Sequence, residues 1–361
     1  MPRLYFEHKL MYHPDVLAKF LKEEKFAPIV VEISPSSRCN LKCDFCYTDY
    51  VMKPEISPAL MDDKLYFKVI KDCADFGVKA ITPCGTGEPL LHAKTPEAIS
   101  YAKQLGLDVS LVTNGVLATK ETMESCLGDL TWVRFSTAAG IAKRYAKLHG
   151  TTEESFHIMM KNLRDLIKIK KQNNLTTTLG MVYFLFEGCS DEIVPFVTEL
   201  KRIGVDYVQI KPCGEFRKNK YIYKKDIYRN QDVADKLREV EELNSDNFYC
   251  QIKYDRFREF EKLEKDGFKL PTKCWGLLFY ANIGSDGKVY TCSGSWYEEN
   301  CCYGSLENNT LKEIFESKRF KDVFERRSIT NVDSCFTSCH CIPMNRYLME
   351  LKDLPLHVNF I

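Results

Sequence analysis

Residues 29–47 read Ile-Val-Val-Glu-Ile-Ser-Pro-Ser-Ser-Arg-Cys-Asn-Leu-Lys-Cys-Asp-Phe-Cys-Tyr, and this stretch decides the fold. Its first part, 29–33, is mostly apolar and predicts a buried strand. Three cysteines follow with the spacing Cys-x3-Cys-x2-Cys, at Cys39, Cys43 and Cys46. Parallel α/β folds place their chemistry in loops that leave the carboxyl ends of strands. The stretch therefore predicts a parallel α/β protein with a cysteine site after its first strand.

The spacing of these cysteines indicates an iron–sulfur cluster with one open iron. Three thiolates can hold three irons of a cubane cluster and leave the fourth iron free, whereas an electron carrier closes all four positions with cysteine. A structural zinc site is one alternative, but zinc takes four ligands, usually in two close pairs. A non-catalytic electron-transfer protein is another, and it is disfavoured because no fourth cysteine stands near Cys39, Cys43 and Cys46.

The cysteine loop resembles that of the radical SAM superfamily, in which an aromatic residue precedes the last cysteine, as Phe45 does here. A second segment, Pro83-Cys84-Gly85-Thr86-Gly87-Glu88-Pro89, resembles the Gly-Gly-Glu-Pro segment of that family, with Thr86 in place of a glycine. A plain tight turn is the alternative for 85–89.

The resemblance implies a [4Fe-4S] cluster whose open iron binds S-adenosylmethionine. The carboxylate of Glu88 would accept a hydrogen bond from the ammonium of this cofactor, and the small residues beside it would let the backbone approach its methionine end. The implied cofactor-binding residues in the two motifs are Phe45, Gly85, Thr86, Gly87 and Glu88.

Apolar strand patterns alternate with amphipathic helix patterns from about residue 28 to about residue 225. The predicted strands are 29–33, 80–83, 108–113, 132–136, 176–185 and 207–211, and the predicted helices include 58–76, 96–105, 155–172 and 192–202. Six β/α repeats indicate a parallel sheet with right-handed crossovers that forms an incomplete barrel. This agrees with the partial (β/α)6 TIM-like barrel that the resemblance implies for 28–225, after an N-terminal extension at 1–27.

Polar side chains also follow the later strands. Asn114 comes after the third strand and Ser136 ends the fourth, and both resemble cofactor-contacting positions of the family; Asn-Gly is also a common turn pair. Lys211 and Cys213 end the sixth strand, where an amine or a thiol would face the substrate as a catalytic group. The alternative for Cys213 is a buried residue without a chemical role.

A second group of cysteines lies in 269–345, after a strongly charged segment at 226–268 that we expect to be a linker with some helix. The pattern Cys274-x12-Gly287-x4-Cys292 resembles the opening motif of the SPASM auxiliary-cluster domain or of its shorter twitch form. Alternation around Asp286-Gly287 predicts a β-hairpin that brings Cys274 and Cys292 together.

The later cysteine spacing departs from the full SPASM pattern, so the resemblance implies one auxiliary [4Fe-4S] cluster in a small α+β domain. A zinc site is the alternative. The tail, 346–361, is expected to pack on the barrel. The implied cluster ligands are Cys274, Cys292, Cys335 and either Cys339 or Cys341.

Composition limits the partners. With 51 Lys plus Arg against 50 Asp plus Glu among 361 residues, no strong basic field attracts nucleic acid or a membrane surface. No signal peptide and no long apolar stretch is present, so we expect a cytoplasmic protein, in which the 16 cysteines serve as metal ligands or free thiols. The resemblance implies an electron donor such as flavodoxin or ferredoxin.

The function expected from these parts is oxidation or epimerisation at a C–H position of a small polar substrate, such as a sugar, aminocyclitol or nucleotide sugar. In the family, reductive cleavage of S-adenosylmethionine supplies a 5′-deoxyadenosyl radical. Modification of a peptide or protein is the alternative. We expect it less because only 28 residues precede the first strand, where such enzymes often carry a leader-peptide module. No cobalamin-binding domain is evident.

Overall fold

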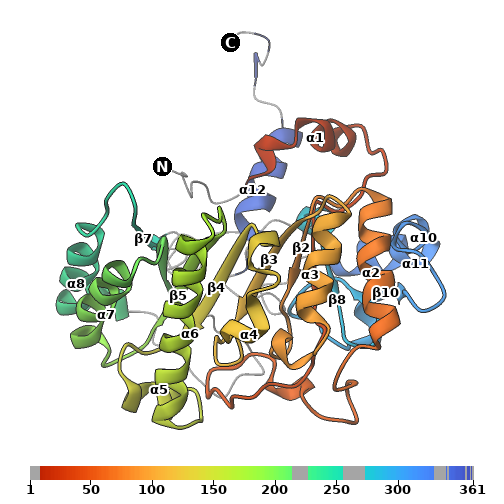
Figure 1. Ribbon diagram of the computed structural model, residues 1–361. Helices are drawn as coiled ribbons and strands as arrows, with labels where there is room; N and C mark the ends of the chain where they lie inside the picture. The colour runs from red at the N-terminus through yellow and green to blue at the C-terminus, as the bar shows by residue number, and fades with distance from the viewer. Residues whose placement is uncertain are drawn as a thin grey trace.

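The computed structural model describes residues 9–213, 227–254, 273–328, 339, 341–353, 356–357 and 359. A ten-stranded sheet organises the chain, in the order β10-β9-β8-β1-β2-β3-β4-β5-β6-β7 (Figure 1). The first seven strands run parallel in chain order. They are β1 (Val30–Ile33), β2 (Ala80–Pro83), β3 (Asp108–Thr113), β4 (Trp132–Thr137), β5 (Thr178–Leu185), β6 (Tyr207–Pro212) and β7 (Tyr249–Ile252).

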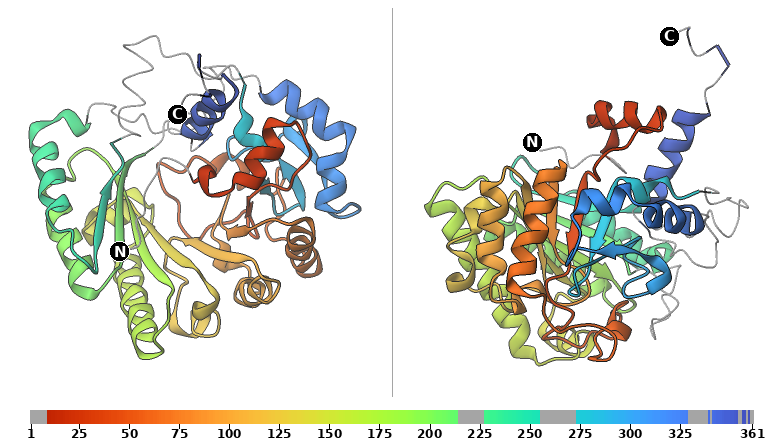
Figure 2. Two further views of the ribbon diagram at one scale, coloured as in Figure 1. Left: turned by 90° about the horizontal axis from the view of Figure 1, so that it is seen from above. Right: turned by 90° about the vertical axis from the view of Figure 1, so that its right-hand side faces the viewer.

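Helices cover the outer, convex side of this sheet, which is seen from above in Figure 2. The longer ones alternate with the strands as a partial barrel requires. They are α2 (Asp63–Phe76), α3 (Thr95–Gln104), α5 (Ala142–Leu148), α6 (Glu153–Gln172), α7 (Ser190–Ile203) and α8 (Gln231–Glu241). Short helical turns stand between them: η2 (Asp49–Val51), η3 (Pro89–Leu91), α4 (Lys120–Met123), η4 (Leu127–Asp129) and η5 (Ile227–Arg229). The predicted partial barrel is confirmed, and all six predicted strands are present.

Helix α2 illustrates how the sequence specifies these elements. The carboxylate of Asp62 accepts from the backbone N–H of Leu65 at 3.0 Å and caps the amino end. Gly77 ends the helix with φ +98°, a conformation that glycine adopts without strain. Between these ends, Val69 and Cys73 are buried against the sheet. Apolar residues one helical turn apart therefore give α2 one buried face.

The prediction of a linker at 226–268 is wrong for its described part. Helix α8 and strand β7 extend the barrel there, and β7 pairs in parallel with β6. Helix α8 carries many charged residues, but it also has an apolar stripe that packs inward. This stripe consists of Val233, Leu237 and Val240. The sheet therefore has one parallel strand more than predicted. Residues 255–268 lie outside the described residues.

The region after the barrel adds strands to the opposite edge of the same sheet. Strand β8 pairs in parallel with β1, and β8 and β9 form the predicted hairpin. This region contains η6 (Trp275–Leu278), β8 (Tyr280–Ile283), β9 (Lys288–Tyr290), η7 (Glu299–Cys301), β10 (Cys302–Ser305), α10 (Leu311–Glu316) and α11 (Lys318–Ser328).

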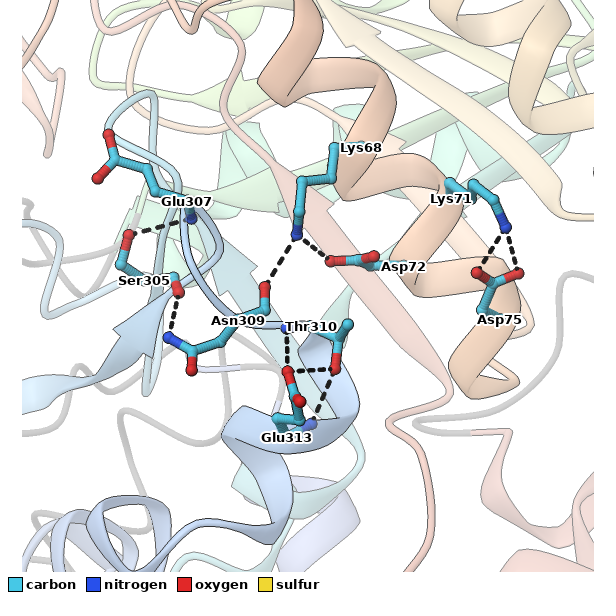
Figure 3. Close-up of polar contacts among 9 residues, drawn as sticks. All are labelled: Lys68, Lys71, Asp72, Asp75, Ser305, Glu307, Asn309, Thr310 and Glu313. Carbon is cyan, nitrogen blue, oxygen red and sulfur yellow. Dashed lines mark hydrogen bonds and ion pairs between the residues drawn. The ribbon is translucent and has the colours of Figure 1, made fainter.

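Polar contacts fasten this region to helix α2, as Figure 3 shows. Lys68 Nζ donates to the backbone carbonyl of Asn309 at 2.9 Å and to Asp72 at 2.7 Å. Thr310 and Glu313 form a capping box at the start of α10. The barrel and the cysteine-containing extension are thus held together by the sheet itself and by α2.

The two ends of the chain pack together. Helix α12 (Cys341–Lys352) lies beside α1 (Pro14–Leu21), which follows η1 (Leu10–Tyr12), at the amino ends of the strands (Figure 1). Leu348, Phe20 and Phe279 share one apolar cluster. The described part of the tail therefore packs on α1 and η6, near the start of β1 and β8. Among the described helices, none has the length and apolar content needed to cross a bilayer.

Candidate active site

The cysteine loop follows β1 at the carboxyl end of the parallel strands. Its three thiols are half-buried, and hydrogen-bond donors stand near the sulfurs. Cys43 Sγ lies 3.1 Å from Nδ1 of His149. Cys39 Sγ accepts from the backbone N–H of Leu41 at 3.5 Å. The loop therefore holds the thiols at the rim of the barrel, as the position after the first strand predicted.

Burial raises the pKa of all three thiols, to about 11 for Cys39. Negative charge on Cys46 and Cys39 raises the pKa of Cys43 further, so the thiols lie near one another. Crowded thiolates need positive charge close by, which iron ions supply. In the described ranges, no three His, Cys, Asp or Glu side chains converge closely enough to bind one metal ion. A cubane takes one thiolate per iron, so the residues present fit a cluster.

The turn at 84–90 packs against the backbone that leads into the cysteine loop. A Cβ atom on Gly87 would stand 2.7 Å from the amide nitrogen of Arg38 and 2.7 Å from the carbonyl oxygen of Ser36. A Cβ atom on Gly85, where φ is +115°, would stand 2.6 Å from Cβ of Ser34. At both glycines the chain itself occupies the space that a Cβ atom would need, and contacts of Gly85 and Gly87 with the cofactor remain predictions. These glycines let the turn and the loop pack together.

Thr86, the residue in place of the glycine of the family pattern, joins the same two segments. Its Oγ1 lies 2.9 Å from Oγ of Ser34, and its backbone carbonyl accepts from Thr48 Oγ1 at 3.0 Å. The Thr48 hydroxyl also lies 3.2 Å from Cys46 Sγ. Because Thr86 is buried and bonded in this way, its side chain holds the segment before the loop and its backbone carbonyl holds the loop itself. A contact of Thr86 with the cofactor remains a prediction.

Glu88 is buried and hydrogen-bonded at both carboxylate oxygens. Oε1 accepts from Thr113 Oγ1 at 2.7 Å and from the backbone N–H of Leu90 at 3.1 Å, and Oε2 accepts from the backbone N–H of Asn114 at 2.8 Å. Burial raises the pKa of Glu88 to about 7, although these hydrogen bonds oppose the rise. A buried carboxylate near half-ionisation at neutral pH suits an incoming ammonium group.

Replacing Glu88 with Gln is expected to weaken S-adenosylmethionine binding by about tenfold or more, because a charge-assisted hydrogen bond is lost. In the unmodified protein the carboxylate form grows as pH rises through about 7, so affinity should increase from about pH 6 to about pH 8. The variant should lack this difference and keep its iron. Equilibrium dialysis measures the affinity for S-adenosylmethionine and its pH dependence, with the exposed Glu97→Gln variant as control. Equal affinities and pH profiles would remove Glu88 from the site.

Two more predicted cofactor residues lie beside the cysteine loop. The ring of Phe45 packs 5.1 Å from that of Phe186 and 5.2 Å from that of His149. Asn114 Nδ2 donates to Asn40 Oδ1 at 2.7 Å, and its Oδ1 accepts from the backbone N–H of Val116 at 3.0 Å. Asn114 therefore makes a turn, as the alternative prediction of an Asn-Gly turn had it, and its side chain also contacts the cysteine loop. Its role toward the cofactor remains a prediction.

The predicted residues on β4 and β6 are placed by strand alternation. On β4, Phe135 and its alternate neighbours pack among the helices, so Ser136 lies on the inner side of the barrel. Lys211 lies on the inner side of β6, with Nζ 5.0 Å from the centre of the Phe184 ring. Cys213 follows β6; burial raises its pKa to about 12, so it is a protonated thiol at neutral pH.

Sequence reasoning missed a polar group inside the barrel. Glu32, in the middle of β1, is hydrogen-bonded to Tyr280 and Cys84. Burial raises its pKa, and the positive charges of Arg134 and Lys211 oppose this rise. One carboxylate in an otherwise apolar strand was the available clue for Glu32. No local pattern pointed to its partners, since they lie on other strands.

The extension brings the second group of cysteines together. The thiol of Cys341 is hydrogen-bonded to Cys274 and to Cys339; the bond to Cys341 lowers the pKa of Cys274. Burial and the charges of Cys339 and Cys274 raise the pKa of Cys292. Both Cys339 and Cys341 thus lie within this group, while Cys335 lies outside the described residues. Four thiols gathered in this way fit a cluster, and their roles as ligands remain predictions.

The two cysteine groups lie at opposite ends of the same strand pair. Strand β8 runs parallel to β1, with Val30 opposite Tyr280. Cys39 follows the carboxyl end of β1, whereas Cys274 precedes the amino end of β8. The inner face of the barrel, with Glu32, therefore extends from one group toward the other.

Two protein-family models match this chain. Residues 33–192 match the radical SAM superfamily, and residues 274–341 match SPASM, an iron–sulfur cluster-binding domain. These domains imply a [4Fe-4S] cluster, S-adenosylmethionine and auxiliary iron–sulfur binding. The matched ranges contain the first and the second cysteine group, respectively.

Among curated proteins, the chain is 30% identical over 194 residues to a probable GTP 3′,8-cyclase of Methanococcus maripaludis, covering 50% of this chain and 64% of that protein. It is 36% identical over 101 residues to an S-adenosylmethionine-dependent nucleotide dehydratase of Lacinutrix mariniflava, covering 27% of this chain and 21% of that protein. The chain thus spans less than two thirds of these relatives.

Solved structures share the fold. SuiB of Streptococcus suis, bound to S-adenosylmethionine, matches with a TM-score of 0.65 and 15% identity, covering 92% of this chain and 76% of SuiB. The protein anSMEcpe with bound AdoMet matches with a TM-score of 0.56 and 19% identity, covering 84% of this chain and 85% of that one. Cysteine loop, fold and family matches agree: the chain belongs to the radical SAM superfamily and carries a C-terminal SPASM domain.

Proposed function

We propose that this protein oxidises or epimerises a C–H position of a small polar substrate that carries an anionic group, such as a sugar phosphate or a nucleotide sugar. When bound, the cluster and S-adenosylmethionine supply the 5′-deoxyadenosyl radical that removes the hydrogen atom. The chain itself would bind and orient the substrate inside the barrel.

The charge inside the barrel is the observation that carries this proposal. Two cations, Arg134 and Lys211, interact there with the charge of Glu32. Both cations suit a substrate with a phosphate or carboxylate group, because guanidinium and ammonium groups bind such anions through charge-assisted hydrogen bonds.

Uncharged polar groups on the same face suit the rest of such a substrate. Asn282 lies opposite Glu32 in the strand register and is fully buried. Within the described residues, neither its amide oxygen nor its amide nitrogen has a hydrogen-bond partner. Gln209 and Gln251 form an amide pair at 3.1 Å on β6 and β7. Buried polar groups require partners, which hydroxyl groups of a substrate can provide.

The names of two relatives support the same substrate class. The methanococcal relative is named for GTP and the one from Lacinutrix for nucleotides, and both ligands carry phosphate. The match to the first covers half of this chain. These names favour an anionic substrate over a peptide.

The test is a set of candidate compounds added to the reduced, reconstituted protein, with formation of 5′-deoxyadenosine as readout. Phosphorylated sugars or nucleotide sugars should accelerate it, and their uncharged counterparts should not. Arg134→Met should raise the concentration needed for half-maximal acceleration by about tenfold or more. The outer-surface variant Arg164→Met, which loses only a pair with Glu199, is the matched control. Acceleration by peptides alone would contradict the proposal and favour the alternative.

Turnover of an active compound in deuterated water then separates epimerisation from oxidation. An epimerase returns a hydrogen atom to the substrate, and we propose as its donor the thiol of Cys213, which is buried and protonated at the end of β6. Deuterium at carbon in the product, lost in Cys213→Ala, supports epimerisation. An oxidised product with unchanged activity in that variant assigns oxidation and excludes the thiol.

A further inference from the structure

His149 connects the end of helix α5 to the cysteine loop. The backbone N–H of Lys42 donates to the carbonyl of His149 at 3.0 Å, and that of Asp44 donates to the carbonyl of Leu148 at 3.0 Å. These two bonds flank Cys43. The loop segment that carries this cysteine is therefore fixed to the helix end, and the His149 ring has a defined position beside the sulfur.

The ring of His149 is held on both of its nitrogens and on its faces. Nε2 lies 3.0 Å from the backbone nitrogen of Ala138, and Nδ1 lies 3.1 Å from Cys43 Sγ. The ring stacks on that of Tyr145, with centres 4.1 Å apart and planes 21° apart, and meets the edge of Phe45. Only 2% of the residue is exposed, so water does not compete for these contacts.

The contact with Ala138 decides which nitrogen carries the proton. A backbone N–H can only donate, so Nε2 of His149 must accept and cannot itself be protonated. The ring proton therefore lies on Nδ1 and points to the sulfur of Cys43. This tautomer follows from the hydrogen-bond network alone. The result is one N–H···S hydrogen bond from a neutral donor to Cys43.

We propose that His149 is a positioning residue that sets the reduction potential of the cluster held by Cys39, Cys43 and Cys46. Hydrogen bonds to ligand sulfurs favour the reduced state, because reduction adds negative charge that the N–H groups stabilise. The inference rests on the proposed cluster at these cysteines and does not depend on the identity of the substrate.

The contact from His149 to Cys43 is shorter than the contacts that the nitrogen donors of Leu41 and Asn114 make to Cys39. The N···S distance is 3.1 Å at Cys43, against 3.5 Å from Leu41 and 3.7 Å from Asn114 at Cys39. Removing this donor should therefore change the potential more than removing the amide of Asn114. No sequence motif indicated that His149 would lie beside the cysteine loop.

Three variants test the inference in the reconstituted full chain. His149→Phe keeps a ring but has no donor, whereas His149→Asn can place an amide N–H near the former Nδ1. Both leave the N–H of Ala138 without its acceptor, so they carry the same structural loss. Tyr145→Phe keeps the stacking and is the control.

The readout is the midpoint potential, measured by redox titration with electron paramagnetic resonance on the signal that changes when S-adenosylmethionine is added. His149→Phe should disfavour reduction about tenfold, which is about 59 mV for one electron. His149→Asn should recover most of the shift, and Tyr145→Phe should show none. An unshifted potential in His149→Phe with full iron content would overturn the inference.

A second measurement needs no variant, so it remains decisive if His149→Phe fails to fold. In protein labelled with ¹⁵N-histidine, the reduced cluster should show hyperfine coupling to a histidine nitrogen and to a proton that exchanges in deuterated water. Absence of both couplings overturns the inference. Failure to assemble the cluster in the unmodified protein would instead contradict the proposed function, so the two failures are distinguishable.

Discussion

Changing Cys39, Cys43 and Cys46 to Ala together is expected to remove about four of about eight irons per chain and to abolish cleavage of S-adenosylmethionine, because each cubane carries four irons. The three thiols stand on one loop, and their charges raise one another's pKa, as expected for ligands that share one cluster. The second cysteine group lies at the other end of the β1–β8 pair and should keep its iron. Iron and sulfide analysis after anaerobic reconstitution measures the loss.

The matched control changes three buried cysteines outside both groups, Cys73, Cys126 and Cys250, to Ala. These side chains lie among apolar residues of the main core, so the control should retain all of the iron. Full iron content in the loop variant would refute the cluster assignment. Zinc in place of the remaining iron would make the second group a structural metal site.

Gly87→Ala is expected to have the second largest effect, loss of both stability and cluster assembly. The new Cβ would meet backbone atoms of Ser36 and Arg38, and backbone cannot move aside as a flexible side chain can. Overpacking of this kind costs about 3 kcal/mol of unfolding free energy. Since Arg38 directly precedes the first cysteine, separation of the turn and the loop should also displace Cys39. Thermal unfolding and iron content measure the two effects.

Gly128→Ala is the control for this variant. A Cβ at Gly128 would meet only the Leu175 side chain at 3.4 Å, an ordinary contact, so its stability should change little. If Gly87→Ala keeps the melting temperature and the iron content of the unmodified protein, the turn does not brace the cysteine loop as the structure indicates. A loss of stability and iron in both variants would indicate that the fold does not tolerate glycine-to-alanine changes in general.

Local sequence patterns were sufficient for the barrel and for the cysteine loop. Strands such as β2 and β3 begin and end where predicted, because each is a short apolar run bounded by turn residues. The hairpin at Asp286-Gly287 forms because that pair suits a tight turn between alternating strands. The linker prediction failed where charges on α8 concealed a buried stripe, since composition alone does not show which face of a helix is apolar.

The sequence by itself determined the elements and their order, the cysteine motif and its place after the first strand, because these depend on neighbours within a few residues. The tertiary structure decided what meets across the sheet. It placed β8 beside β1 and brought the charges of Glu32 and Arg134 close enough to interact. It also brought His149 into contact with Cys43, 106 residues away. Such contacts depend on strand register and helix packing, which arise only when the whole core forms, so no local pattern could predict them.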